Sequence, residues 1–325
     1  MGYWKERLIE AAESGLVVEA ADDKFVCAEC VRDESLRDVV AESVADDTCT
    51  FCGATSDEGV AAPLEALVDH IAQCMRLHYE DAANALPHES AEGGYQGPSL
   101  DTWDVLDEMG LENAVSDGRD DLFKAIRDSF EKTTWCHRDP FALTQHERLS
   151  YSWERFCEFI KHERRFFFAS GESYVKKDEI GDRLLDPGEM LKAIVKHCLQ
   201  LRLVRPVLAG SDVYRVRRQK GARPFRAALS LGAPPPNAAL QSNRMSPPGV
   251  VMTYLAEDER TALRETADRG RHRYAIGKFM VTRDVLVLDL TMVPPVPSIF
   301  DLGMASVRDA IRFLRAFTRD LSKPT

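Results

Sequence analysis

The sequence predicts an α+β protein, in which a cysteine-bearing N-terminal segment and a helical domain precede a C-terminal domain that mixes strands with helices. Three observations support this. Two Cys-x2-Cys pairs lie within the first 52 residues, apolar residues recur at three- and four-residue spacing over residues 60–168, and short alternating segments begin at Ser211. At 325 residues, the chain is long enough for two or three domains.

The two cysteine pairs predict a structural zinc site. Cys27-x2-Cys30 and Cys49-x2-Cys52 are separated by an 18-residue spacer, which lets four thiolates surround one ion tetrahedrally. Four cysteine ligands fill the coordination shell of zinc, so we expect a structural rather than a catalytic metal. The alternatives are four unrelated cysteines or a redox Cys-x-x-Cys motif.

Residues 60–168 are predicted to be helical throughout, with breaks at the glycines of residues 93–98. Asp101, or Ser99 before it, can cap the helix that follows, and further helices are expected over 120–133 and 145–165. Buried thiols are expected at three cysteines in apolar settings, namely Cys74, Cys136 and Cys157.

One pair on the 145–165 helix could carry chemistry. Arg155 and His162 bracket six residues, and this spacing resembles the arginine and histidine of metal-independent HEPN ribonucleases. The simpler interpretation, which we favour, is a surface arginine and a surface histidine on an amphipathic helix, because so short a pattern often arises by chance.

The C-terminal half follows a predicted linker at residues 169–182. A helix over 186–201 is capped by Asp186 and begins at Pro187. Strands are expected at 212–218, 249–256, 274–281 and 284–291, helices at 258–267 and 304–321, and a proline-rich loop at 292–303. The predicted domain boundaries are 1–58, 59–168 and 183–325.

The composition and charge of the chain indicate where the protein is located and which ligands it can bind. The longest apolar runs fall short of 18 residues, which argues against a membrane span, and residues 1–16 read as an amphipathic helix rather than a signal peptide. We therefore expect a cytoplasmic protein. Residues 1–200 hold 21 Lys+Arg against 42 Asp+Glu, whereas residues 201–280 hold 15 against 6. This asymmetry makes a broad nucleic-acid surface unlikely and favours either a phosphate-bearing ligand for the basic part or attraction between the two halves.

Four residues of the basic part could form a dinucleotide site. Arg215 and Arg244 can grip a pyrophosphate through charge-assisted bonds. Tyr254 offers a flat face for a base or a nicotinamide ring, and Glu265 can stabilise positive charge that develops on a ribose. The alternative is an ordinary surface, with Glu265 as an exposed helix residue and the two arginines as solvated residues at strand edges.

This stretch resembles the RES domain family, named for its Arg, Glu and Ser. The matching residues are the strand arginine, an arginine with a Pro-Gly turn, Tyr-Leu-Ala, and Thr-Ala-Leu-x-Glu: Arg215; Arg244, Pro248 and Gly249; Tyr254, Leu255 and Ala256; Thr261, Ala262, Leu263 and Glu265. The resemblance covers residues 184–325. It implies an ADP-ribosyltransferase-like fold and a toxin that degrades NAD by phosphorolysis or hydrolysis, often paired with an antitoxin protein.

By this resemblance, Arg215 and Arg244 hold phosphates, Tyr254 packs on nicotinamide, and Glu265 stabilises the ribosyl cation that phosphate or water attacks. The family's serine lies well downstream of the glutamate. Here Ser298, Ser306 and Ser322 fall in a loop, a helix and a helix end, so the resemblance predicts a fragment or a shortened relative. A non-catalytic binding module with a degenerate RES domain is the corresponding alternative.

The N-terminal part is similar to HEPN/RES N-terminal domains. The resemblance is carried by the zinc knuckle, the helical block and the segments GGYQG, LDTWDVLD and SWERFCEFIKHERRFFF. The resemblance does not assign a function to this domain, and a ribonuclease contribution through Arg155 and His162 stays open as an alternative.

Overall fold

The computed structural model describes residues 23–163, 183–219, 221, 225, 230–235, 237, 249–267, 270 and 272–323. The helix predicted at residues 1–16 and the linker at 169–182 lie outside these ranges. The chain divides into two compact units, residues 1–190 with 295–312, and residues 191–294 with 313–325. Each unit is described by itself.

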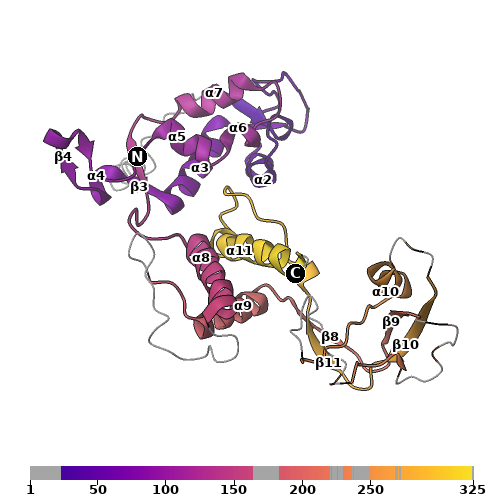
Figure 1. The fold of residues 1–325 in the computed structure, drawn as a ribbon. Helices are drawn as coiled ribbons and strands as arrows, with labels where there is room; N and C mark the ends of the chain where they lie inside the picture. Colours follow the sequence, from indigo (N-terminus) through magenta and orange to yellow (C-terminus); the bar gives the residue numbers. More distant parts are fainter. Residues whose placement is uncertain are drawn as a thin grey trace. The chain divides into compact units, whose positions relative to one another are not determined.

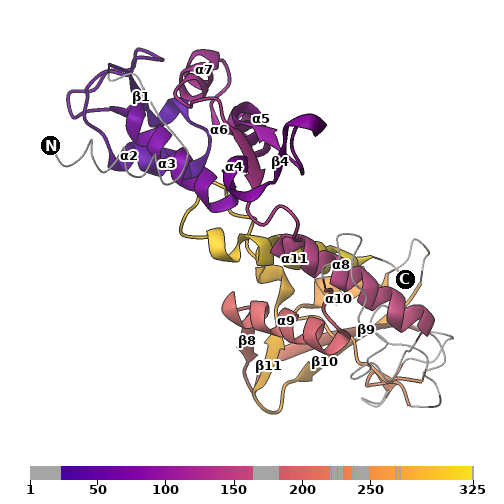
Figure 2. The same ribbon diagram turned by 90° about the vertical axis from the view of Figure 1, so that its left-hand side faces the viewer.

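The first unit begins with the cysteine segment. Strand β1 (Phe25–Cys27) pairs antiparallel with β2 (Ala61–Pro63), and the short helix η1 (Ala28–Cys30) follows β1 directly. The helix α2 (Glu34–Glu42) is capped by Asp33, whose carboxylate accepts the Leu36 N–H at 3.1 Å, and it packs on α3 (Leu64–His78). Figure 2 shows these two helices next to β1 in the indigo and purple part of the ribbon.

The core of this unit is built on the inward face of α3. Its apolar residues recur at helical spacing and are buried: Leu64, Leu67, Val68, Ile71, Ala72, Cys74 and Met75. Helices α5 (Thr102–Glu108), α6 (Leu111–Ala114) and α7 (Asp120–Asp128) complete the core. The predicted cap of α5 is confirmed, because the Asp101 carboxylate accepts the backbone N–H groups of Trp103 and Asp104, both at 2.8 Å.

The prediction that residues 60–168 are helical throughout was wrong. Short strands interrupt the helices: β3 (Tyr79–Asp81), β7 (Thr134–His137) and β6 (Leu100–Asp101) form one antiparallel sheet in the order β3-β7-β6, and β4 (His88–Glu89) pairs with β5 (Gly94–Tyr95). The one-turn helix α4 (Ala82–Ala85) follows β3. The pairing of β3 with β7 joins residues more than 50 positions apart and leaves no periodic signal in the sequence, and β7 carries the β-favouring pair Thr134 and Trp135.

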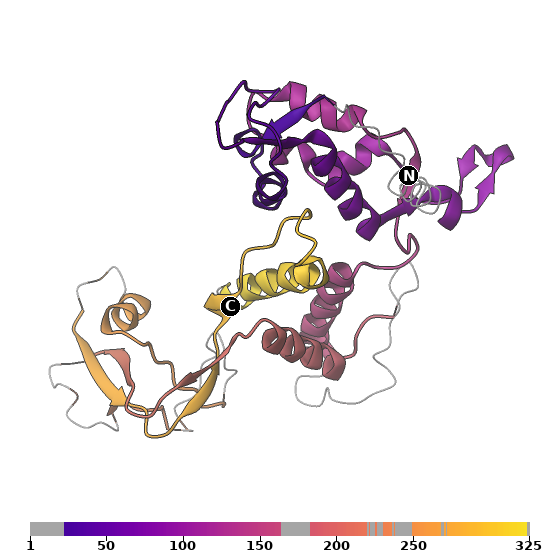
Figure 3. The same ribbon diagram turned by 180° about the vertical axis from the view of Figure 1, so that it is seen from behind.

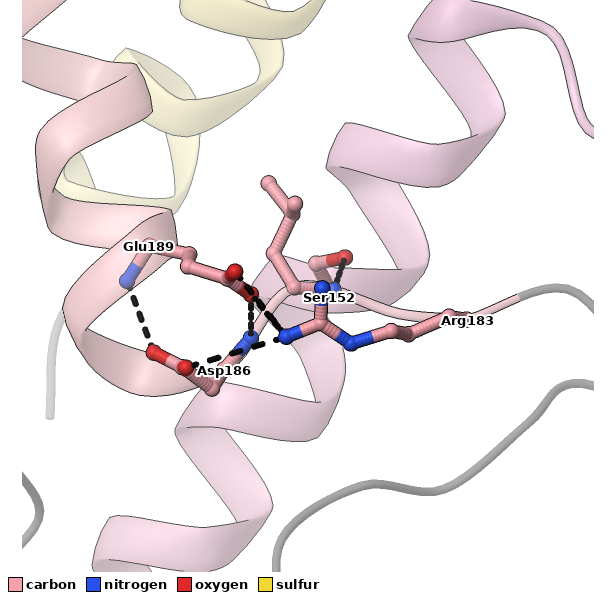
Figure 4. A network of polar contacts seen from close by, with 5 residues as sticks. Ser152, Arg183, Asp186 and Glu189 are labelled. Carbon is pink, nitrogen blue, oxygen red and sulfur yellow. Dashed lines mark hydrogen bonds and ion pairs between the residues drawn. The ribbon is translucent and has the colours of Figure 1, made fainter. Parts of the chain in front are cut away.

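The helix α8 (Gln145–Glu158) runs into a π-helical turn, η3 (Phe159–Glu163), and α9 (Pro187–Gln200) begins after the linker. A polar network joins α8 to the start of α9 (Figure 4). Ser152 Oγ accepts the Leu185 N–H at 2.9 Å, and Asp186 and Glu189 cap each other's backbone N–H groups at 2.8 and 2.9 Å. Arg183 donates to both Glu189 oxygens at 2.9 Å, so the predicted Asp186 cap is confirmed within a larger clamp.

The second unit contains two antiparallel strand pairs. They are β8 (Val204–Val207) with β11 (Val285–Leu288), and β9 (Asp212–Arg218) with β10 (Tyr274–Met280). The helix α10 (Glu259–Thr266) packs on β9, as Figure 1 and, from behind, Figure 3 show. A short helix, η7 (Leu290–Met292), follows β11, and α11 (Ala305–Ser322) ends the described chain.

The strand predicted at residues 249–256 does not form. The segment makes a single bridge, between Ala256 and Tyr214 of β9, and its apolar side chains Val250, Met252 and Leu255 are exposed. The apolar run resembles a strand, but a strand needs a ladder of hydrogen bonds, and this segment bonds β9 at one residue only.

The proline-rich loop at 292–303 has an unexpected position. Its residues from Pro295 onward belong to the first unit, and Phe300 is 2% exposed within the core built on α3. Figures 1 and 3 show this yellow loop extending from the start of α11 toward α2 and α3. A segment that the sequence assigned to the C-terminal domain is thus part of the N-terminal core.

The mixture of helices and antiparallel strands confirms the α+β fold class. Within the described ranges, every helix is too short or too polar to span a bilayer.

We expect Thr102→Val to destabilise the first unit by about 1–3 kcal/mol, because it leaves buried donors unpaired. Thr102 is 1% exposed, and its Oγ1 accepts from Thr133 N at 2.9 Å and from Trp135 Nε1 at 3.1 Å. Urea unfolding followed by tryptophan fluorescence measures this, since all four tryptophans lie before residue 191. The control Thr134→Val changes an exposed threonine of β7 and should stay within about 0.5 kcal/mol of the parent.

Candidate active site and metal centre

A cavity of about 560 Å³ lies between β9, α10 and the segment that leads into α10. Val216 of β9 and Ala262 of α10 are both 6% exposed and form its packed floor. Tyr214 and Ala256 exchange both of their backbone hydrogen bonds, at 2.7 and 2.8 Å, and this pair fixes the second wall beside the strand. Asp258 then starts α10 by accepting the Thr261 N–H at 2.8 Å, which confirms its predicted role as the helix cap.

Three of the four predicted site residues line this cavity. Arg215 comes from β9, Tyr254 from the segment before α10, and Glu265 from the last turn of α10. Tyr254 is 42% exposed and Glu265 is also exposed, so both are accessible at the cavity that they line. The cavity volume falls within the range of sites for small molecules and cofactors.

Arg215 is half-buried, and its side chain already makes hydrogen bonds within the protein. Its Nη1 donates to the backbone carbonyls of Leu231, at 3.2 Å, and Gly232. Within the described part of the chain its hydrogen bonds use Nη1 alone, which leaves Nε and Nη2 for an anion. Burial and the neighbouring charge of Arg217 lower the pKa of Arg215, so an anionic ligand would relieve both penalties.

Sequence reasoning missed an ion-pair cluster at the lip of the cavity. Arg205 of β8 donates to Asp289 Oδ2 at 2.7 Å through Nε and to Glu257 through Nη2. Glu257 lines the cavity between Tyr254 and α10, so Arg205 ties this wall to the strand pair β8–β11. No local pattern in the sequence could have joined three residues that lie up to 84 positions apart.

The remaining predicted residues of the site are placed as follows. Arg244 and Pro248 lie outside the described residues. Gly249 has φ +87°, a left-handed conformation that favours glycine and suits the predicted turn. Of Ser298, Ser306 and Ser322, none is among the described residues that line the cavity; Ser298 Oγ instead accepts the Phe300 N–H at 3.0 Å.

The four N-terminal cysteines converge as the sequence predicted and could hold a metal ion. Their ligand atoms all lie within 4.8 Å of one another, and three of the four residues are buried. Sulfur–sulfur distances are 3.7 Å for Cys27–Cys30, 3.4 Å for Cys27–Cys52 and 3.8 Å for Cys30–Cys49. A tetrahedral site with metal–sulfur bonds of about 2.3 Å has edges of about 3.8 Å, whereas a disulfide needs about 2 Å. The geometry therefore fits a four-thiolate metal site.

Backbone donors prepare this cluster for negative charge. Burial raises the pKa of Cys27 and of Cys30. Burial acts in the same direction on Cys49, but backbone N–H groups of Cys52, Phe51 and Cys27 outweigh it and lower the pKa of that thiol to about 7. The Cys27 N–H lies 3.3 Å from Cys49 Sγ. Thiolates held by backbone N–H groups are typical of metal-binding knuckles.

Arg155 and His162 are each paired with an acidic neighbour. Arg155 is 17% exposed and bonds Glu163 at 2.6 Å, whereas His162 is 68% exposed and lies 3.4 Å from Glu158. The π-helical turn between them changes the regular spacing on which the ribonuclease resemblance relied. His162 therefore fits the interpretation as a surface residue, whereas Arg155 is mostly buried and paired with Glu163.

Comparison with protein families finds a match for each of two segments of the chain. A model described as HEPN/RES N-terminal domain 1 matches residues 42–174, and a model described as the RES domain matches residues 212–322. The chain carries a HEPN/RES N-terminal domain followed by a RES domain. Comparison with curated proteins and with solved structures finds no match.

The cavity, the cysteine cluster and the Phe300 loop fall differently with respect to the two matched segments. The cavity with Arg215, Tyr254 and Glu265 lies wholly within the RES match. Of the cysteine cluster, Cys49 and Cys52 fall inside the HEPN/RES match, and Cys27 and Cys30 precede it. The Phe300 loop belongs to the RES match by sequence and to the N-terminal unit by its contacts.

We expect Cys49→Ser to abolish stoichiometric metal binding, because it removes a buried ligand of a four-thiolate site. Plasma mass spectrometry of the purified protein should find about one zinc per chain in the parent and little in the variant. Cys157→Ser is the control, since Cys157 lies outside the cluster and is only half-buried. Equal metal content in all three proteins would contradict the assignment.

Arg205→Met should loosen the wall of the RES cavity by removing both ion pairs of the lip. Amide hydrogen exchange over residues 254–258 should accelerate about three- to tenfold, as the loss of one or two modest polar contacts predicts. Arg260→Met, on the exposed side of α10, is the matched control. Unchanged exchange would mean that the Tyr214–Ala256 bonds hold this wall alone.

Proposed function

We propose that the protein is an NAD-degrading enzyme that cleaves the bond between nicotinamide and ribose. One observation carries the proposal: Arg215, Tyr254 and Glu265 line the same cavity within the RES match, although they come from a strand, a loop and a helix. An anion-binding arginine, an aromatic face and a carboxylate are the groups that a pyrophosphate, a nicotinamide ring and a ribosyl cation need.

The cleavage proceeds by loss of nicotinamide. The C1′–N bond of the nicotinamide riboside breaks, and its electron pair returns to the pyridine ring, which leaves as neutral nicotinamide. Glu265 stabilises the positive charge that then develops on the ribose, and Tyr254 holds the leaving ring. Arg215, together with Arg244, holds the pyrophosphate.

An oxygen nucleophile completes the reaction. When water attacks C1′, the product is ADP-ribose and the released proton passes to solvent. When inorganic phosphate attacks through one of its oxygens, the product is ADP-ribose 1″-phosphate, and the P–O bonds of the phosphate stay intact. The exposed position of Glu265 leaves room for either nucleophile on the open side of the cavity.

The same proposal assigns the other parts of the molecule. The four cysteines hold structural zinc, residues 59–168 form the HEPN/RES domain and residues 183–325 the RES domain. The enzyme acts in the cytoplasm as a toxin of a toxin–antitoxin or defence system, and a separate antitoxin protein neutralises it. An NAD-binding module without turnover is the corresponding alternative function.

Glu265→Gln should lower kcat/KM for NAD at least about 100-fold, because it removes the carboxylate that faces the developing charge while keeping its shape. Incubation with NAD, with and without phosphate, followed by chromatography of nicotinamide and mass analysis of the ribosyl product, measures the rate and identifies the nucleophile. Glu259→Gln is the control, because Glu259 lies on the same helix and does not line the cavity.

Two outcomes would contradict the proposal. If the parent protein binds NAD but releases no nicotinamide, it is a binding module. If the parent cleaves NAD and Glu265→Gln does so at the same rate, the reaction occurs elsewhere in the molecule. Growth arrest of bacteria expressing the parent, relieved by Glu265→Gln and not by Glu259→Gln, would support the role as a toxin.

A further inference from the structure

The loop before α11 is RES sequence that has become part of the N-terminal core. Phe300 is 2% exposed and belongs to the same buried cluster as the α3 residues Leu67 and Ile71. Ile299 and Leu302, on either side of it, pack on the same cluster. An aromatic side chain with this burial is a principal contributor to a core rather than an incidental contact.

Polar bonds fix the backbone of this loop around Phe300. His70 of α3 donates from Nε2 to the Phe300 carbonyl at 2.7 Å, although 230 residues separate the two. Within the loop, Ser298 Oγ accepts the Phe300 N–H at 3.0 Å and Asp301 accepts the Met304 N–H at 3.0 Å. The loop is therefore held both by its own turns and by α3.

The anchored loop leads directly into α11. Arg308, one turn into that helix, donates from Nε to the Pro297 carbonyl at 3.1 Å, and Asp309 accepts the His146 N–H of α8 at 3.3 Å. The first half of α11, to Arg312, belongs to the first unit. The second half belongs to the second unit, which holds most of the RES sequence and is called the RES unit below, and its residues Phe313 and Leu314 are buried. Because a helix forms cooperatively, restraint of its first turns also favours the turns that follow.

We propose that the N-terminal domain binds the RES segment Ile299–Leu302 in cis, with Phe300 as the anchor, and that this contact holds the RES helix α11 in place. The cysteine cluster takes part, because Cys27, Cys30 and Cys49 belong to the same core cluster as Phe300. Metal binding by these cysteines thus supports the core that holds Phe300, and through Phe300 it supports α11. This proposal is independent of the NAD chemistry, since it concerns which parts of the chain fold together.

Hydrogen exchange of the full-length, zinc-loaded protein tests the contact. Phe300→Ala should accelerate exchange at residues 305–312 by at least about 100-fold, because a large-to-small change in a core costs that much in local opening. Phe300→Leu should retain most of the protection. Leu286→Ala is the control, since Leu286 is 76% exposed on β11 and should leave α11 unchanged.

If Phe300→Ala does not fold, His70→Ala tests the same contact between α3 and the loop. It removes one bond to the loop and leaves Phe300 in place, so exchange at 305–312 should rise about three- to tenfold while the rest of α3 stays protected. If exchange at 305–312 matches the parent in both His70→Ala and every folded Phe300 variant, the anchor does not hold α11 and the proposal is wrong.

Zinc removal tests the link to the cysteine cluster. Chelation of zinc from the parent protein should accelerate exchange at 305–312 as well as at the cysteine knuckles. Acceleration confined to residues 25–63 would overturn this part of the proposal. Neither exchange measurement requires NAD turnover, so an inactive RES domain and an absent Phe300 anchor give different results.

Discussion

The burial of Phe300 is the constraint on which the arrangement of the chain depends. A side chain from RES sequence occupies a place in a core that otherwise consists of N-terminal residues, and the chain then returns to the RES unit through α11. The two compact units are therefore not two consecutive stretches of sequence. Residues 1–190 alone do not make up the first unit, which also includes residues 295–312, and these residues in turn interrupt the second unit between residues 294 and 313.

The candidate active site depends on a few backbone bonds rather than on a large core. One bonded pair, Tyr214 with Ala256, sets Tyr254 beside β9, and one cap, Asp258, sets the start of the helix that carries Glu265. The wall between them is exposed and is tied to the rest of the unit by Arg205. A site built in this way can adjust to a ligand at low cost, since little buried apolar surface must move.

Local chemistry made much of this structure predictable. The four cysteines, the caps at Asp101, Asp186 and Asp258, the helices α9, α10 and α11 and the strands β9, β10 and β11 follow from spacing, capping and alternation over a few residues. The convergence of Arg215, Tyr254 and Glu265 followed from resemblance to a family. What the sequence could not supply is non-local: the sheet β3-β7-β6, the Arg205 cluster and the place of Phe300 each join residues far apart in the chain.

The failed strand at residues 249–256 shows why pattern and pairing differ. The segment is rich in apolar residues, but a strand is stabilised by a ladder of hydrogen bonds, and this segment makes a single bridge to β9, at Ala256. The consequence reaches the site. Tyr254 and Leu255 remain exposed and line the cavity instead of being buried in a sheet. The same feature that weakens the segment as structure makes it suitable as a binding wall.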